Sequence, residues 1–258
     1  MRNIVAGNWK SNKLMVEARE LMVAVYKGVS VDGLTDVILA PPAPFLSALV
    51  LEAPENKSIS WAGQQCSGYE MGAYTGEFTA SMLHSIGVCS VLIGHSERRD
   101  KFGESEEMVA MKLRSALDSG LTAILCCGEN LGERESGGHF TRVMEQLKHA
   151  LHGVSEKEME DVVLAYEPIW AIGTGRTASA DQAQEMHHAI REFIKENWGE
   201  MIAGNTRILY GGSCKPSNAG EIFAQPDVNG GLIGGAALSA ADFLAIVDAS
   251  DQSLRETH

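Results

Sequence analysis

The stretch that decides the fold runs from Val162 to Asn197 and reads VVLAYEPIWAIGTGRTASADQAQEMHHAIREFIKEN. It opens with a short apolar run rich in β-branched residues, Val162 to Ala165, and closes with a segment of helical periodicity, Ala180 to Asn197. A polar, Gly-containing loop joins the two. Because the short run is apolar on both faces, the stretch predicts one strand of a parallel sheet followed by a helix that covers it.

The same pattern recurs along the chain and predicts seven further strands: Asn3 to Ala6, Val37 to Ala40, Ser58 to Ala62, Ser90 to Ile93, Thr122 to Cys126, Arg207 to Tyr210 and Gly231 to Ile233. The helices expected between them include Leu14 to Lys27, Glu106 to Leu117, Phe140 to Leu151 and Ala240 to Ala249. About eight strand–helix units in 258 residues suit a closed (β/α)8 barrel of the α/β class, and an open, doubly wound sheet is the competing fold. No linker, low-complexity tract or charge block interrupts the pattern, so we expect residues 1–258 to form a single domain.

Composition narrows the possible partners. The formal net charge of −13 and the pI near 5.0 argue against a nucleic acid partner, because affinity for the phosphate backbone comes largely from Lys and Arg. No stretch approaches the ~20 apolar residues that span a membrane, and the polar start from Met1 to Lys13 does not read as a leader, so we expect a cytoplasmic protein. The five cysteines lack CxxC spacing and favour reduced, buried thiols over disulfides or a zinc site.

In a (β/α)8 barrel the active site lies at the carboxyl ends of the strands, so polar residues there are functional candidates. Asn8 and Lys10 follow the first strand, where Lys10 is either a solvated lysine or a cation that holds an anionic substrate and stabilises an oxyanion. His95 follows the fourth strand in the run GHSERR, Gly94 to Arg99. The charges in that run, including Glu97, are either a structural cluster or part of a catalytic site.

The sixth strand leads into Glu167 and then into an apolar loop, Pro168 to Gly175. A glutamate beside apolar groups at a barrel mouth is suited to general-base catalysis, because a partly desolvated carboxylate binds a proton more tightly. A loop that is stiff at one end and Gly-rich at the other is typical of a lid that excludes water. Residues 173–178 also spell GxGxxA, the outline of a dinucleotide-binding fingerprint, but a Rossmann turn follows its strand immediately and this one does not.

Paired glycines follow the last two strands, in Tyr210 to Ser213 and in Gly234 to Ala237. Such pairs are either tight turns or loops whose backbone N–H groups close on an oxyanion, with the dipole of a short helix in support. Since two of them occur in successive loops of a barrel that often binds phosphate there, we favour a phosphate site.

Taken together, these motifs resemble the triosephosphate isomerase family, in the family's order, from Asn3 to about Ala249. The motifs are GNWK (7–10), AYTGE (73–77), GHSERR (94–99), the run from Tyr166 to Gly175, YGGS (210–213) and GGA (234–236). The resemblance implies a TIM barrel that interconverts dihydroxyacetone phosphate and glyceraldehyde 3-phosphate in glycolysis and gluconeogenesis, without metal or organic cofactor.

The resemblance also implies roles for single residues. Glu167 resembles the base that moves the carbon proton, His95 the neutral electrophile, and Asn8 and Lys10 its partners at the substrate oxygens. Glu97 resembles a supporting acid beneath Lys10 and His95. The residues that resemble phosphate ligands are Gly173, Ser213, Gly234 and Gly235.

In the family, the loop that corresponds to Gln65 to Glu77 reaches into a second subunit, and the residue that matches Thr75 lies close to the partner's site. A homodimer is therefore expected. Two residues depart from the family's pattern: Ser11 stands where an apolar residue is frequent, and Ala237 replaces a frequent serine in the last phosphate loop.

Two rival functions remain open on the same fold. A non-catalytic phosphate-binding scaffold or sensor is expected to have lost Glu167, His95 or Lys10, and all three are present. A different sugar-phosphate isomerase or lyase is also compatible with the barrel, and a Schiff-base lyase would have Lys10 as its best candidate nucleophile.

Overall fold

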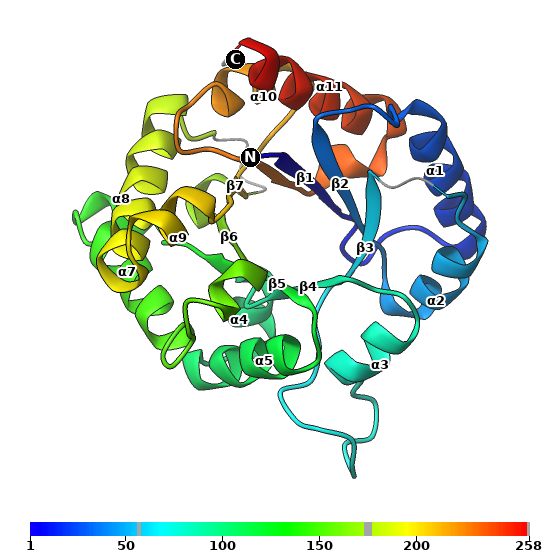
Figure 1. Ribbon diagram of the computed structural model, residues 1–258, viewed down its shortest axis with the longest axis horizontal. Coiled ribbons are helices and arrows are strands. Elements are labelled where there is room, and N and C mark those ends of the chain that lie inside the picture. Colours follow the sequence, from blue (N-terminus) through cyan, green and yellow to red (C-terminus); the bar gives the residue numbers. More distant parts are fainter. Residues whose placement is uncertain (56–57, 173–176, 257–258) are drawn as a thin grey trace.

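A computed structural model describes residues 1–55, 58–172 and 177–256 and forms a closed barrel of parallel strands in the order β1 to β8 (Figure 1). The strands are β1 Asn3–Asn8, β2 Thr35–Ala40, β3 Ile59–Gly63, β4 Ser90–Ile93, β5 Thr122–Cys127, β6 Val162–Tyr166, β7 Ile208–Tyr210 and β8 Gly230–Ile233. The barrel closes between β1 and β8, where Ile4 to Gly7 lie in register with Gly230 to Ile233. The prediction of a (β/α)8 barrel is therefore confirmed and the open sheet is wrong.

Helices form a ring outside the strands (Figure 1). They are α1 Met15–Gly28, α2 Ala43–Glu52, α3 Ala80–Ser85, α4 Ser96–Phe102, α5 Glu106–Asp118, α6 Leu131–Glu135, α7 His139–Ala150, α8 Ala180–Trp198, α9 Glu200–Asn205, α10 Pro216–Phe223 and α11 Ala240–Glu256, with 3-10 turns η1 Glu158–Asp161, η2 Ile169–Ala171 and η3 Gly235–Leu238. The five helices expected from periodicity all form, and α11 continues past the expected end at Ala249. The shorter helices, which have five to ten residues, were not predicted, because so few residues do not establish a helical period.

The strands are apolar on both faces because each face packs against a different core. Alternate residues such as Val5 and Leu164 point outward and join the large cluster between sheet and helices. Their neighbours point inward and fill the barrel itself: Ile4, Ala6, Ile38, Ala40, Ala62, Leu92, Ile124, Cys126, Val163, Ala165, Leu209 and Leu232. The filled interior leaves the strand ends as the place where a ligand can be held.

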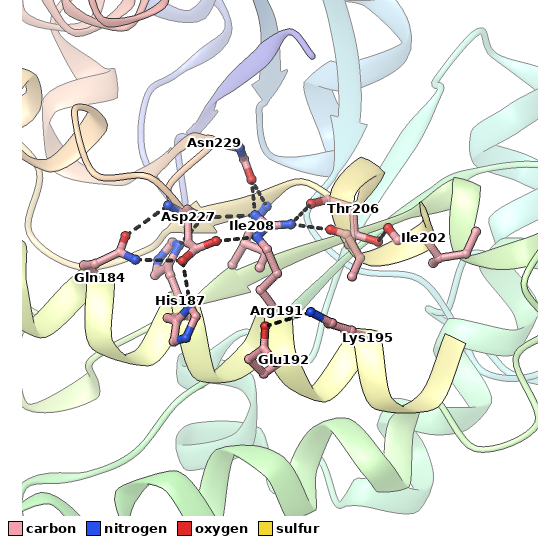
Figure 2. Close-up of polar contacts among 12 residues, drawn as sticks. Gln184, His187, Arg191, Glu192, Lys195, Ile202, Thr206, Ile208, Asp227 and Asn229 are labelled. Carbon is pink, nitrogen blue, oxygen red and sulfur yellow. Dashed lines mark hydrogen bonds and ion pairs between the residues drawn. The ribbon is translucent and has the colours of Figure 1, made fainter. Parts of the chain in front are cut away.

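Arg191 of α8 ties the helix ring to the beginning of β7 and β8 (Figure 2). Its Nε donates to Oδ1 of Asp227 at 2.6 Å, and its Nη2 donates to Oδ1 of Asn229 at 2.8 Å. The Asn229 oxygen also accepts from the Ile208 amide at 3.0 Å, and Gln184 donates to the other Asp227 oxygen at 2.7 Å. Burial alone would raise the pKa of Asp227, but the hydrogen bonds from Gln184 and Arg191 bring it below its usual value.

The loop between β3 and α3 extends away from the rest of the molecule, at the bottom of Figure 1. Near its tip Tyr69 stacks on Tyr74 with ring centroids 4.5 Å apart, and Met71 is 72% exposed. The loop therefore presents apolar side chains to its surroundings.

The cysteines are free thiols, as expected, and four of the five are buried. Cys89 is exposed, so the expectation of burial is wrong at that position. Across residues 1–55, 58–172 and 177–256, no helix combines the length and the apolar character that a membrane crossing requires.

Candidate active site

A cavity of about 440 Å³ opens at the carboxyl ends of the barrel strands. Its walls come from the loops after β1, β4, β6, β7 and β8. The lining residues are Asn8, Lys10, His95, Glu97, Lys101, Glu167, Ile172, Gly211, Gly212, Ser213, Cys214, Lys215, Leu232, Gly234, Gly235 and Ala236. Eight of the nine described residues that sequence analysis placed at the site thus meet around one space, and Thr75 does not.

Glu167 and His95 face each other at the base of this cavity. Oε1 of Glu167 lies 3.1 Å from Nε2 of His95, and Oε2 accepts from the Ser96 amide at 2.9 Å. Both side chains are almost completely buried, with 2% of Glu167 and 6% of His95 exposed. A carboxylate held in this way, with few water contacts, is a well-positioned acceptor for a proton from a bound ligand.

The orientation of the His95 ring is set by the start of α4. His95 is the N-cap of this helix, and its Nδ1 accepts the amide N–H of Glu97 at 3.2 Å. Because Nδ1 acts as an acceptor, the proton of the neutral ring is on Nε2, the atom that faces the cavity and Glu167. His95 can therefore donate a hydrogen bond to an oxygen of a bound ligand.

Two glycines leave the space that Glu167 occupies. A Cβ on Gly128 would lie 1.8 Å from the carbonyl oxygen of Glu167, and a Cβ on Gly211 would lie 2.8 Å from its Cγ. The Glu167 amide also continues the β5–β6 pairing by donating to the Cys127 carbonyl at 2.7 Å. The backbone pairing fixes the position of the Glu167 main chain. The two glycines leave room for its backbone and side chain.

Lys10 is held in a strained conformation beside the cavity. Its φ of 50° lies in the left-handed region, which is costly for a residue with a side chain. Asn8 accepts the Lys10 amide through Oδ1 at 2.9 Å, and Gln64 donates to the Lys10 carbonyl at 2.8 Å. These two hydrogen bonds stabilise the turn that aims the ammonium group inward.

The Lys10 ammonium lies 2.7 Å from Oε1 of Glu97. Burial would raise the pKa of Glu97, but the hydrogen bond and charge of Lys10 outweigh it and lower this pKa below its usual value. Glu97 is therefore an anion under Lys10, with its other oxygen 3.8 Å from Nδ1 of His95.

The part of the cavity wall that follows β7 and β8 consists mainly of backbone. Gly211, Gly212 and Ser213 follow β7, and Gly234 and Gly235 lead from β8 into the turn η3. A Cβ on Gly234 would approach Lys10 Cε to 3.3 Å, so a side chain there would crowd the lysine. Exposed N–H groups at the start of a helical turn suit a phosphate group. Gly173, the remaining residue expected at this wall, lies outside the described residues.

Several residues of the cavity were not predicted from the sequence, including Lys101, Cys214 and Lys215. Lys101 lies on α4, a helix too short to be recognised from its periodicity, so nothing indicated which way its side chain points. Lys215 is the N-cap of α10, next to a phosphate motif that was recognised. Thr75 is exposed on the β3–α3 loop and is not part of the cavity wall in this chain.

Glu129 anchors the beginning of the loop after β6. Its side chain is fully buried and accepts hydrogen bonds from the Tyr166 hydroxyl at 3.0 Å and from Trp170 Nε1 at 2.8 Å. Its carbonyl accepts the Ile169 amide at 3.1 Å. Burial raises the pKa of Glu129 despite these hydrogen bonds. The loop that sequence analysis interpreted as a lid thus starts from a fixed, buried polar cluster.

Comparison with known proteins agrees with this geometry. The family model for triosephosphate isomerase matches residues 3–250. The chain is 49% identical over 250 residues to a triosephosphate isomerase from Chlorobium luteolum, an alignment that covers 96% of this chain and 98% of the relative. It is 48% identical to a triosephosphate isomerase from Flavobacterium johnsoniae and 47% identical to one from Porphyromonas gingivalis. Each of these alignments covers 96% of this chain and 99% of the relative. The chain belongs to the triosephosphate isomerase family and is an isomerase that interconverts dihydroxyacetone phosphate and glyceraldehyde 3-phosphate.

Proposed function

We propose that the isomerisation proceeds through an enediolate in the cavity around Glu167 and His95, with Glu167 as the base. The Glu167 carboxylate takes a proton from the substrate carbon next to the carbonyl. The electron pair of that C–H bond forms the carbon–carbon double bond, and the carbonyl electrons move onto oxygen. The hydroxyl proton of the deprotonated carbon then moves to the oxygen that gained the charge, and the oxygen that lost it forms the new carbonyl. The same carboxyl group returns the carbon proton to the neighbouring carbon, which yields the isomer. The observation that carries this proposal is the buried Glu167–His95 pair, 3.1 Å apart.

His95 is the electrophile in this mechanism. Its Nε2–H, assigned from the acceptor role of Nδ1, donates to the substrate oxygen on which negative charge develops. A neutral donor stabilises that charge without first forming a strong ion pair with Glu167. Asn8, which is 5% exposed and lines the same cavity, contributes to binding of the substrate oxygens.

Lys10 stabilises the enediolate oxygen and attracts the phosphate, and Glu97 holds Lys10 in place. Their 2.7 Å ion pair also argues against the rival Schiff-base lyase, because a lysine nucleophile must be a free amine. The strained backbone of Lys10 supports a functional role, since strain of this kind is retained where geometry matters.

The substrate phosphate binds at the loops after β7 and β8. The backbone N–H groups of Ser213, Gly234 and Gly235 are its ligands, and η3 adds the dipole of a short helical turn. Gly173, in the loop after β6, is the further phosphate ligand in this proposal. The same loop is proposed as a lid, which excludes water and protects the enediolate from loss of phosphate.

The chain works as a homodimer in this proposal and as one domain over its whole length. The exposed loop from Gln65 to Glu77, with Met71 at 72% exposure, is suited to insertion into a partner, where Thr75 approaches the partner's cavity. The enzyme acts in the cytoplasm, in glycolysis and gluconeogenesis, and needs no metal or organic cofactor.

A coupled assay tests the mechanism. Purified protein is supplied with glyceraldehyde 3-phosphate, and dihydroxyacetone phosphate is followed without added metal or cofactor. Glu167→Gln keeps the size of the side chain but cannot accept the proton, so we expect turnover to fall by at least about a hundredfold. Glu196→Gln, at an exposed position of α8, is the matched control and should keep the wild-type rate. Near-normal turnover by the Glu167→Gln variant would rule out Glu167 as the base.

A further inference from the structure

Three lysines line the active-site cavity, and only one of them has a role in the mechanism above. Lys10 is paired with Glu97 at 2.7 Å. Lys101 and Lys215 are exposed, and neither has an ion-pair partner within 4.0 Å among the residues that the structure describes. Two unpaired cations at the entrance of a cavity, in a chain with a formal net charge of −13, require an explanation.

The charges of the catalytic residues do not favour an anionic ligand. Lys10 contributes one positive charge and Glu97 and Glu167 one negative charge each, so these three leave the cavity with one excess negative charge. A phosphate monoester carries a charge of about −1.5 to −2 at pH 7. Counted as net charge, the catalytic residues therefore disfavour a dianionic substrate at long range, and so does the rest of this acidic chain.

Lys101 and Lys215 reverse the sign of this local charge. With both counted, the charged residues that line the cavity within the described part of the chain carry one excess positive charge. Lys101 lies in the last turn of α4, four residues after Glu97, so the two side chains share a helix face. The charge of Lys101 contributes to the lowered pKa of Glu97. Lys215 is two residues after Ser213, at the N-cap of α10. The helices α4 and α10 lie on different sides of the barrel (Figure 1), and each contributes one of the two lysines to the cavity lining, with Lys215 at the N-cap of α10.

We infer that Lys101 and Lys215 are steering residues for the substrate dianion: they make the cavity entrance positive and raise the rate and strength of substrate capture without contacting the reacting carbons. This inference rests on the proposed function, because it concerns the same cavity and the same phosphate-bearing substrate. Low-dielectric walls around a cavity concentrate the field of such charges, so two residues suffice to change capture measurably.

The test compares Lys101→Met and Lys215→Met, singly and together, with Lys148→Met. Lys148 is exposed on α7 and does not line the cavity, so its replacement changes the net charge equally but elsewhere. We expect each cavity variant to lower kcat/KM for glyceraldehyde 3-phosphate by about three- to tenfold at ~0.01 M ionic strength, with kcat within about twofold of wild type. At ~1 M ionic strength the Debye length shrinks from about 30 Å to about 3 Å. The difference in kcat/KM between the cavity variants and wild type should then disappear. Lys101→Arg and Lys215→Arg should retain wild-type capture.

Several outcomes would overturn the inference. The two lysines do not steer the substrate if Lys101→Met and Lys215→Met have the same kcat/KM as Lys148→Met at low ionic strength. A loss that persists at ~1 M ionic strength would indicate a short-range contact instead of a field. Binding of inorganic phosphate, followed by thermal shift, gives a second readout that needs no turnover: its apparent Kd should rise in the cavity variants. If wild type binds phosphate but does not isomerise the substrate, the proposed function fails while the steering inference is still tested.

Discussion

Nε2 of His95 lies 3.1 Å from Oε1 of Glu167, although the two residues are 72 positions apart in the chain. His95 follows β4 and Glu167 follows β6, and β5 alone separates these strands in the barrel. Parallel strands place their carboxyl ends on one rim, so neighbouring loops can bring an acid and an imidazole together. The pair is the centre of the proposed chemistry.

Replacement of His95 by Asn should reduce turnover much more than substrate affinity. Asn is a favourable N-cap and can still accept the Glu97 amide, so α4 should remain intact. It removes the Nε2–H donor that faces the substrate, so we expect kcat to fall by about a hundredfold or more while KM changes little. Steady-state kinetics and a thermal unfolding curve measure both effects. A change confined to KM would exclude His95 as the electrophile.

Gly211→Ala should impair catalysis by displacing Glu167. The new Cβ would lie 2.8 Å from Glu167 Cγ and 3.0 Å from the Tyr166 carbonyl oxygen, and close contacts of this kind cost about 1–3 kcal/mol. We expect at least a tenfold lower kcat and a lower free energy of unfolding. Gly204→Ala in α9 is the control: a Cβ there meets nothing within 4 Å, so the variant should be active and slightly more stable. Full activity of the Gly211→Ala protein would mean that Glu167 does not depend on this space.

His187 should make folding stability depend on pH between about 6.5 and 4. Burial lowers the pKa of His187 to about 4, although hydrogen bonding to the Asp227 carbonyl opposes this shift. An unfolded chain takes up a proton at this residue below about pH 6.5, and the folded chain does not until about pH 4. The contribution of His187 to the free energy of unfolding is therefore fully present above about pH 6.5. As the pH falls to about 4, up to about 3 kcal/mol of this contribution is lost.

Urea unfolding at a series of pH values measures this dependence. His187→Phe should reduce the loss of stability between pH 6.5 and pH 4, because the titrating group is gone. His84→Gln, at an exposed position in the last turn of α3, should leave the pH dependence unchanged. Equal losses in wild type and His187→Phe would show that other groups cause the dependence.

Met71→Asp should dissociate the proposed homodimer. Sedimentation equilibrium of the wild type should give about twice the chain mass of 27.7 kDa. A carboxylate at the tip of the β3–α3 loop would be buried without a partner in a dimer interface, so the variant should sediment as a monomer with reduced activity. Met201→Asp is a matched control, because Met201 is also 72% exposed but lies on α9. A wild-type protein that is monomeric at micromolar concentration would contradict the dimer.

The fold was predictable because its signal is local. Each strand, such as Val162–Tyr166, is apolar on both faces, and the barrel gives both faces a core, one inside and one beneath the helices. The predicted strand boundaries agree with the observed ones to within two residues. The short helices, such as α4, were not predicted because their seven or so residues carry no clear period and their ends are set by side chains such as His95.

The candidate site was predictable in its membership more than in its geometry. Glu167, His95, Lys10 and Asn8 follow strand ends, and a barrel gathers those ends on one rim. No local pattern indicated that Gln64 would fix the Lys10 carbonyl, that Gly128 and Gly211 would make room for Glu167, or that Lys101 would turn toward the cavity. These relationships join residues that are far apart in the chain.

The sequence by itself therefore determined the alternation of strand and helix and the residues that follow the strand ends, because periodicity and strand ends are properties of neighbouring residues. It favoured the barrel over an open sheet, and the structure decided that the barrel closes between β1 and β8. Only the tertiary structure decided which nitrogen of His95 faces Glu167, how Lys10 is held in its left-handed turn, and which lysines surround the cavity. Distances of a few ångströms between separate loops depend on closure of the whole barrel, and no local stretch of sequence contains that information.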